Sequence, residues 1–326
     1  MERQRTFGTG GKMKTENRMT TLADLEIGNP KTVLNLTAVP LSGNPASTLD
    51  YLLIDEALEA KKVVVEEVSE GGSVPELRMT NFANKVVLIV DGTELVGAKQ
   101  NRIVNASFLI PPESVTRIPV SCVEQGRWGY KGREFGVSKH FSPHRIRRDN
   151  AEFHKTTLKQ NRGYASEQGK VWAHVADMSH QMAAPTMTGA MNDVLEQREG
   201  SIEEYRKGIS LDGAGTGAAF FVNGIFQGIE LFDREATFGK MFPKLLSGVA
   251  VEAMMAQGQK LSARRAKTPE EAVVYVKRIL AEVSKSLFEK FEPVGMGEDW
   301  RYDAKRSFGK ALHYGPDLIH FSAFGK

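Results

Sequence analysis

The chain has 326 residues, 41% of them hydrophobic and 25% charged, which supplies enough apolar side chains for one large or two modest globular domains. Its formal net charge of +3 is nearly balanced and gives no argument for nucleic-acid binding by overall charge. The single cysteine, Cys122, excludes an intramolecular disulfide and a cysteine-based zinc cluster.

The first 20 residues are rich in Gly, Lys and Thr, and we expect them to form a flexible N-terminus. They carry positive charge but lack the apolar segment and the small-residue cleavage site of a secretory signal. No apolar run in the chain approaches the roughly 18 residues that span a bilayer. A cytoplasmic location with no membrane partner is therefore expected.

Residues 21–135 are predicted to form a β-rich domain. Strand-like runs rich in β-branched residues alternate with turn residues, and they occupy residues 32–41, 49–54, 63–68, 76–82, 85–91, 102–110 and 115–122. Asp55 is expected to cap a short helix after the second run. Pro119 indicates an edge position or a bulge in the last run. Six or more short strands at this spacing predict a sandwich or a barrel-like arrangement.

Residues 136–210 are predicted to form a basic and helical segment. Ten Lys or Arg residues against three Asp or Glu residues lie between Arg127 and Arg162. Val171, Val175 and Met178 recur at steps of three and four, as one buried helix face requires. Two further helices are expected at 188–197 and 201–209, the second with Ser201 and Glu204 in capping-box spacing.

Residues 211–326 are predicted to form a C-terminal α/β region packed on the β-rich domain. Asn223-Gly224 joins two apolar runs, which is a strong hairpin signal. A helix is expected over 236–256 with a kink or break at Pro243, and another begins with Thr268 as its N-cap. A closing strand is expected near 317–324. The fold class predicted for the whole chain is α+β.

Polar side chains concentrate between Asp91 and Trp128, inside strand-like runs where they are costly to bury without partners. Carboxylates beside a lysine can perform acid–base chemistry or hold a divalent cation through oxygen ligands. The structural alternative is a turn aspartate followed by a solvated loop. Catalytic roles are expected for Asp91, Glu94, Lys99 and Glu124. Ligand-binding roles are expected for Gln100, Asn101, Arg102, Asn105, Gln125, Trp128, Gln168 and Trp172.

Other candidate motifs favour structural interpretations. Cys122 has no neighbouring histidine to lower its pKa, so a small buried side chain is favoured over a nucleophile. His140 and His144 have a spacing that can chelate a metal on a helix, but Pro143 between them disfavours a regular helix. No metal ligand is assigned. The glycine-rich stretch 212–217 lacks a following helix, which favours a hinge over a phosphate-binding loop.

Several longer motifs resemble one protein family. They are LDYLLIDEALE, VSEGGSVPELR, VDGTELVGAKQNR, IPVSCVEQGRW, SEQGKVW, GAAFFVNGIFQGIELFD and FPKLLSGVAVEA. Together they resemble the ARG and rhodanese-phosphatase superfamily associated protein domain, over about Thr32 to Ala256. That family is named for its neighbours, which are ADP-ribosylglycohydrolase-type and rhodanese/phosphatase-type proteins. The resemblance implies a nucleotide-related role by analogy, because the family name records an association and not a reaction.

The function expected is that of an enzyme or ligand-binding protein acting on a nucleotide-like or ADP-ribose-like phosphorylated molecule. Asp91 and Glu94 would be acid–base groups or ligands of a divalent cation, and Lys99 would neutralise phosphate. These groups are expected to converge on one cleft with Gln168 and Trp172. One alternative is a non-enzymatic homo-oligomeric interaction protein that docks through 139–162. Nucleic-acid binding through the same basic segment is the less favoured alternative.

Overall fold

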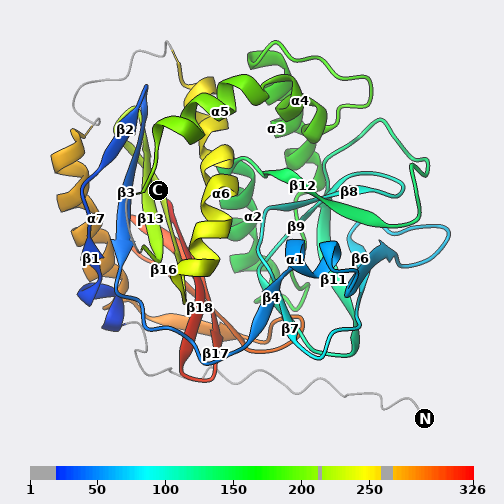
Figure 1. Cartoon of the computed structure of the whole chain (residues 1–326), viewed down its shortest axis with the longest axis horizontal. Helices are drawn as coiled ribbons and strands as arrows, with labels where there is room; N and C mark the ends of the chain where they lie inside the picture. Colours follow the sequence, from blue (N-terminus) through cyan, green and yellow to red (C-terminus); the bar gives the residue numbers. More distant parts are fainter. Residues whose placement is uncertain (1–19, 212–214, 258–266) are drawn as a thin grey trace.

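The computed structural model describes residues 20–211, 215–257 and 267–326, so the predicted flexible N-terminus lies outside the described residues except for Thr20. Within the described residues the chain forms a nine-stranded sheet, a six-stranded sheet and a three-stranded sheet, with helices packed between and around them (Figure 1). The predicted α+β class with a β-rich N-terminal part is confirmed. None of the described helices is long and apolar enough to cross a membrane.

The nine-stranded sheet joins strands from both ends of the chain. Its strands, in spatial order with β2 pairing beside β3, are β1 (Glu26–Ile27), β2 (Lys31–Val33), β3 (Leu36–Ser42), β13 (Gly217–Val222), β14 (Ile225–Phe232), β18 (Asp317–Gly325), β17 (Ser307–Tyr314), β16 (Glu298–Asp303) and β15 (Phe288–Phe291). All of the pairings in this sheet are antiparallel. The short 3-10 helix η1 (Thr20–Asp24) leads into β1.

Helices cover both faces of this sheet, which explains the nearly continuous apolar sequence of β13. Phe220 packs on one face in the same cluster as residues of α6 (Glu235–Met255). Phe221 packs on the other face with residues of α7 (Pro269–Val283). Alternate side chains of a strand point to opposite faces, so both faces need apolar residues here.

The β-rich part consists of the two smaller sheets, which share one hydrophobic core. The six-stranded sheet runs in the order β12 (Phe135–Phe141), β8 (Thr93–Gly97), β9 (Arg102–Val104), β11 (Ser114–Cys122), β6 (Glu76–Asn81) and β5 (Val63–Glu67). The three-stranded sheet contains β10 (Phe108–Ile110), β7 (Val86–Ile89) and β4 (Tyr51–Leu53). Helix α1 (Ile54–Glu59) follows β4 directly. Helix α6 packs between the three-stranded sheet and the large sheet.

Four helices fill the middle of the chain, and the last three of them lie where the sequence predicts helices. They are α2 (His144–Thr157), α3 (Gln168–Gln181), α4 (Met191–Gln197) and α5 (Glu199–Gly208). The predicted α3 face, Val171, Val175 and Met178, is buried with residues of α4, α5 and the end of α6. Pro243 lies inside α6, which continues through it as a single helix instead of breaking.

Several local predictions differ from the structure. Helix α1 begins with Leu53 as N-cap, so Asp55 lies in the first turn, and Glu56 accepts the Leu53 N–H at 2.9 Å. The predicted strand 102–110 is split by a bend between β9 and β10. Ser201 lies inside α5, whose N-cap is Arg198, because α5 follows α4 almost without interruption. Strand β12 occupies part of the segment that was expected to be helical.

Pro119 lies where β11 changes partners. Residues up to Pro119 pair with β6, and the pairing with β9 begins at Val120. A proline has no N–H to contribute to a ladder, so it is tolerated at such a crossover.

The N-terminus of α7 forms as predicted. Thr268 is the N-cap and Pro269 the first helical residue, and Glu271 completes a capping box with Thr268. We predict that Thr268→Ala lowers the free energy of unfolding by about 1 kcal/mol. The Glu271 N–H loses its acceptor, the Thr268 hydroxyl, and the bond from the Thr268 N–H to the Glu271 carboxylate is weakened. Urea denaturation measures this change. Thr156→Ala, at an exposed position of α2, is the matched control and should not destabilise the protein.

Candidate functional site

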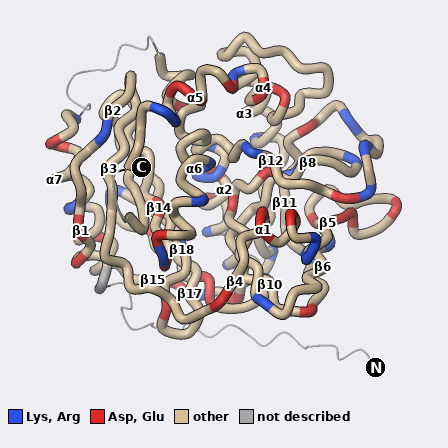
Figure 2. Tube along the Cα trace, viewed as in Figure 1, with Lys and Arg blue, Asp and Glu red and all other residues tan. Residues whose placement is uncertain are grey.

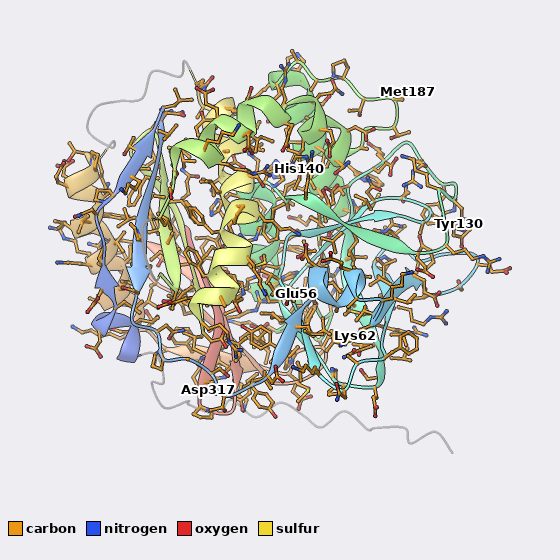
Figure 3. The ribbon with its side chains drawn as sticks, in the orientation of Figure 1. Glu56, Lys62, Tyr130, His140, Met187 and Asp317 are labelled. Atoms are coloured by element: carbon orange, nitrogen blue, oxygen red, sulfur yellow. The ribbon has the colours of Figure 1, made fainter. Side chains whose placement is uncertain are left out.

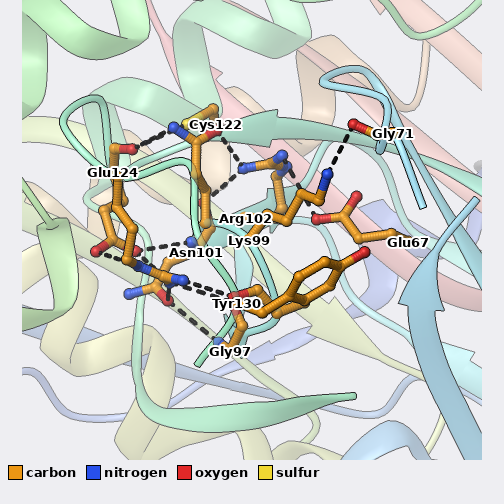
Figure 4. A network of polar contacts seen from close by, with 12 residues as sticks. Glu67, Gly71, Gly97, Lys99, Asn101, Arg102, Cys122, Glu124 and Tyr130 are labelled. Carbon is orange, nitrogen blue, oxygen red and sulfur yellow. Dashed lines mark hydrogen bonds and ion pairs between the residues drawn. The ribbon is translucent and has the colours of Figure 1, made fainter. Parts of the chain in front are cut away.

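A polar network centred on Glu124 includes the predicted site residues Lys99, Asn101 and Arg102 (Figure 4). The Glu124 carboxylate is buried and accepts hydrogen bonds from Arg127 at 2.6 and 2.8 Å, from the backbone N–H of Asn101 at 3.0 Å and from the Thr188 hydroxyl at 2.9 Å. Burial by itself raises the pKa of Glu124, but these hydrogen bonds outweigh it and lower the pKa below its usual value. Glu124 is therefore a fixed carboxylate whose oxygens are already engaged.

Arg102 and Gln100 extend this network toward β5. The Gln100 amide donates to the Glu124 backbone carbonyl at 2.9 Å, and its oxygen accepts from Arg102 at 3.0 Å and from the Cys122 thiol at 3.2 Å. Arg102 Nη2 lies 3.9 Å from a carboxylate oxygen of Glu67, although both side chains are buried. Cys122 is thus an enclosed hydrogen-bonding residue, as its sequence context indicates.

Lys99 lies between two aromatic rings at the edge of the network. Its ammonium is 5.2 Å from the ring centroid of Trp128 and 5.1 Å from that of Tyr130, and it donates to the backbone carbonyl of Gly71 at 2.9 Å. Trp128 and Tyr130 are half-exposed, and Figure 3 shows Tyr130 at the periphery of the molecule. The cation–π contacts hold Lys99 against the protein.

Besides Thr188, three residues of the network were not predicted. Arg127 follows Glu124 by three residues in the same motif, and Tyr130 comes three residues later. Glu67 had a readable signal, because it shares the buried face of β5 with Val63 and Val65. A charged side chain at a buried alternating position indicates a polar partner inside the protein.

A hollow of about 470 Å³ lies beside α3 and adjoins the Glu124 network. Its lining residues are Gln125, Trp172, Val175, Ala176, Ser179, His180, Ala183, Pro185, Thr186 and Gly189. The segments 124–126 and 188–190 connect it to the network, since Gly126 N–H donates to the Thr188 carbonyl at 2.7 Å and Thr188 donates to Glu124. The neighbouring Met187 is fully exposed (Figure 3).

Two buried polar atoms in the walls of this hollow have no hydrogen-bond partner among the described residues. They are the indole Nε1 of Trp172 and the hydroxyl of Thr186. Gln168 positions Trp172, because its side-chain amide bonds both the N–H and the carbonyl of Cys122, at 2.8 and 2.7 Å, and so fixes the start of α3 against β11. Trp172 lies one helical turn further along α3.

Asp91 belongs to a different, fully buried cluster. Its carboxylate contacts Arg147 at 3.0 Å, Lys310 at 2.7 Å and the Ser107 hydroxyl at 2.9 Å. Arg147 also contacts Glu230 at 2.7 Å. Burial opposes ionisation, but the charges of Arg147 and Lys310 hold the pKa of Asp91 well below its usual range. Asp91 shares no partner with Glu124 among the described residues, so the structure places these two predicted residues in separate networks.

The turn at Asp91-Gly92 is required by this cluster. Gly92 has a φ of +84°, and a Cβ there would lie 2.5 Å from Cδ of Arg147. Only glycine tolerates this backbone conformation and also leaves room for the Arg147 side chain. Gly92 is therefore required both for the turn and for the packing of Arg147 beside Asp91.

Glu94 is buried, with the Ser138 hydroxyl and the Asn192 backbone near its carboxyl group. Neither carboxyl oxygen makes a well-formed hydrogen bond among the described residues, and the Ser138 hydroxyl donates to the Asn192 side chain at 2.8 Å. Burial, with the nearby charges of Asp193 and Glu124, raises the pKa of Glu94 to about 8. Glu94 is therefore mostly protonated at neutral pH.

The remaining predicted residue, Asn105, has a structural environment. Its amide donates to the Tyr164 carbonyl at 2.9 Å and accepts from the Ser121 hydroxyl at 2.6 Å. These bonds tie the bend between β9 and β10 to β11 and to the loop that precedes α3.

The histidines and basic residues of 139–162 are largely engaged with the rest of the protein. His140 lies 3.3 Å from Glu196, whereas His144 packs against Phe324, so the two histidines do not share a site. Arg145 pairs with Glu252 at 2.9 Å. Within the described residues no group of three or more His, Cys, Asp or Glu side chains is arranged to hold a metal ion.

Comparison with known proteins gives one match. A model of the ARG and Rhodanese-Phosphatase-superfamily-associated Protein domain matches residues 24–324, a range that begins just before β1 and ends inside β18. No curated protein and no solved structure matches the chain.

Proposed function

Since the chain belongs to the ARG and Rhodanese-Phosphatase-superfamily-associated Protein family, we propose that it binds a small nucleotide-like molecule in the hollow beside α3. The base of this ligand would lie against the indole of Trp172. The observation that carries the proposal is a ligand-sized hollow lined by Trp172 and Thr186, whose indole Nε1 and hydroxyl are buried and have no hydrogen-bond partner among the described residues.

The size and lining of the hollow suit a heteroaromatic ring. Its volume of about 470 Å³ falls within the usual range for small-molecule sites, roughly 300–1,000 Å³. Trp172, Val175 and Pro185 supply an apolar wall, and an indole offers a face on which a base can stack.

The charge of the lining residues indicates that the base lies inside the hollow and the phosphate outside it. Among the described lining residues there is no Lys, Arg, Asp or Glu, so the part of the ligand inside the hollow is neutral. His180 is an exposed lining residue, and an imidazole N–H suits a phosphate that extends toward solvent. The proposal concerns binding, because Glu124 beside the hollow has its carboxylate oxygens engaged by Arg127 and Thr188.

The proposal predicts that Trp172→Ala weakens the binding of adenosine, AMP or ADP-ribose by about 5- to 150-fold, which is the range for loss of one base–aromatic stack. Isothermal titration calorimetry with each of these compounds measures the affinity. Trp172→Phe keeps a stacking face but removes the indole N–H, and it should give an intermediate affinity.

Phe82→Ala is the matched control, because Phe82 is an exposed aromatic residue that does not line the hollow. It should bind as the wild type does. Absence of any heat of binding with all three compounds at millimolar concentration would rule out the proposal. Equal affinity of the wild type and Trp172→Ala would rule out this hollow as the site.

A further inference from the structure

A second hollow, of about 690 Å³, lies where α1, β12, α5 and α6 meet. Its lining residues are Asp55, Val137, Ser138, Lys139, Glu203, Arg206, Lys207, Lys240, Pro243 and Lys244. None of them lines the hollow beside α3. The site proposed above therefore leaves this second hollow without a role.

The lining carries five Lys or Arg side chains and two carboxylates, those of Asp55 and Glu203. Three more carboxylates, Glu56, Glu196 and Glu199, pair with these cations from outside the lining. Lys240 and Lys244 are four residues apart on α6 and so project from the same face of that helix. In Figure 2, blue segments on α5 and α6 mark these basic residues, and the acidic residues of α1 are drawn red.

Arg206 is the best-placed cation for recognising a phosphate. Its side chain is only 15% exposed, and Nη1 contacts Glu199 at 2.9 Å and Glu203 at 3.4 Å. Its Nε donates to the carbonyl of Pro243 at 3.4 Å. Among the described residues Nη2 has no hydrogen-bond partner, so a side of the guanidinium fork is available to an oxyanion.

The lysines are paired with carboxylates that a strong anion can replace. Lys139 contacts Glu196 at 3.0 Å with about half of each side chain exposed, and Lys240 pairs with the partly exposed Glu56. Lys207 lies 3.9 Å from Glu203 and is 78% exposed. Such solvent-exposed pairs contribute little to stability, so Lys139, Lys207 and Lys240 can exchange partners at small cost. Lys244 is only 15% exposed and pairs with Asp55.

We propose that this hollow binds a compact polyvalent phosphate, with two or more linked phosphate groups, through Arg206, Lys244 and the surrounding lysines. The carboxylates around the hollow offset its cations, so a monovalent anion gains too little to displace them. A polyphosphate brings several charged oxygens at once and can engage several cations together. The site should therefore discriminate by the number of phosphate groups.

Inorganic pyrophosphate, tripolyphosphate and orthophosphate are the probes. Calorimetry at low salt should show tighter binding of tripolyphosphate and pyrophosphate than of orthophosphate, with affinity falling as sodium chloride is added. Arg206→Gln combined with Lys244→Gln should weaken pyrophosphate binding by about 10-fold or more. Lys159→Gln combined with Lys290→Gln removes the same charge from residues outside the hollow and should leave the affinity unchanged.

The folding of the double variant is checked by its thermal transition. If it does not fold, Lys139→Gln with Lys207→Gln carries the same test, because both side chains are more than half exposed. No binding of pyrophosphate, or equal affinity in the site and control variants, would overturn the proposal. Trp172→Ala should bind pyrophosphate as the wild type does, so failure of the nucleotide site and failure of this site can be told apart.

Discussion

Replacing Arg147 with methionine should lower the free energy of unfolding by about 3–5 kcal/mol, the range for removing one partner from a buried ion network. The guanidinium of Arg147 lies between Asp91 and Glu230, at 3.0 and 2.7 Å, and all three side chains are buried. Methionine keeps much of the volume but leaves two carboxylates with less positive charge around them. Lys310 still contacts Asp91 in the variant. The lost stability therefore comes mainly from the ion pair between Arg147 on α2 and Glu230.

Urea denaturation at neutral pH measures this loss. Arg148→Met is the matched control, since Arg148 is adjacent on α2, nearly half-exposed and paired with its neighbour Asp149. The control should change stability by less than about 0.5 kcal/mol. Equal effects of the two substitutions would show that the buried cluster does not hold the β-rich part and α2 to the large sheet.

Glu94→Gln should stabilise the protein increasingly as the pH rises. The Glu94 carboxyl keeps its proton in the folded protein up to a pKa of about 8, whereas in the unfolded chain it loses the proton near 4.5. Between these values the unfolded state releases a proton that the folded state retains, so wild-type stability falls as pH increases. At pH 7 the penalty is on the order of 3 kcal/mol. Glutamine resembles the protonated acid and does not ionise, so it avoids this penalty.

The measurement is the difference in unfolding free energy between Glu94→Gln and the wild type across pH 4 to 9. We expect a small, constant difference at pH 4, where the carboxyl is protonated in both states, and a growing advantage of the variant up to about pH 8. The value at pH 4 serves as the internal control for packing effects. A difference that stays flat across this range would mean that Glu94 ionises normally inside the fold.

The candidate site residues near the hollow beside α3 were partly visible in the sequence. Lys99, Gln100, Asn101 and Arg102 are consecutive, and β9 pairs Arg102 with Cys122, two residues before Glu124. Gln125 and Trp172 were predicted to lie at one cleft, and both line the hollow. The residues that complete its walls, from Ser179 to Gly189, gave no signal, because no motif or spacing in the sequence connects them with Gln125 and Trp172.

The second hollow, between α1, β12, α5 and α6, could not be predicted from the sequence. Its cations come from β12, α5 and α6, and only the packing of α6 against α5 and β12 brings Lys139, Arg206 and Lys244 together. Along the chain each of them looks like an ordinary solvated charge. No spacing rule connects them, so a sequence pattern cannot indicate the site.

Local signals were sufficient where a few neighbouring residues determine the backbone. The Asn223-Gly224 turn has φ of +50° and +71°, as a type I′ hairpin requires, and Thr268 caps α7 as its sequence indicates. The α+β class followed from the same kind of information, because apolar periodicity acts within one element. These features are determined by residues only a few positions apart, so the sequence alone specifies them.

Only the tertiary structure decided which charges are buried. Strands β16 and β17 were not predicted, since charged residues such as Asp299, Arg301 and Lys310 do not fit an apolar strand pattern. They are buried because Arg301 pairs with Asp299 at 2.9 Å and Lys310 with the distant Asp91 at 2.7 Å. Ser107 similarly contacts His320 across 213 residues of sequence. A charged side chain is buried only when it is paired with a partner of opposite charge or a hydrogen-bonding group. For most of these side chains the partner lies in another element, so the pairing depends on how the whole chain packs.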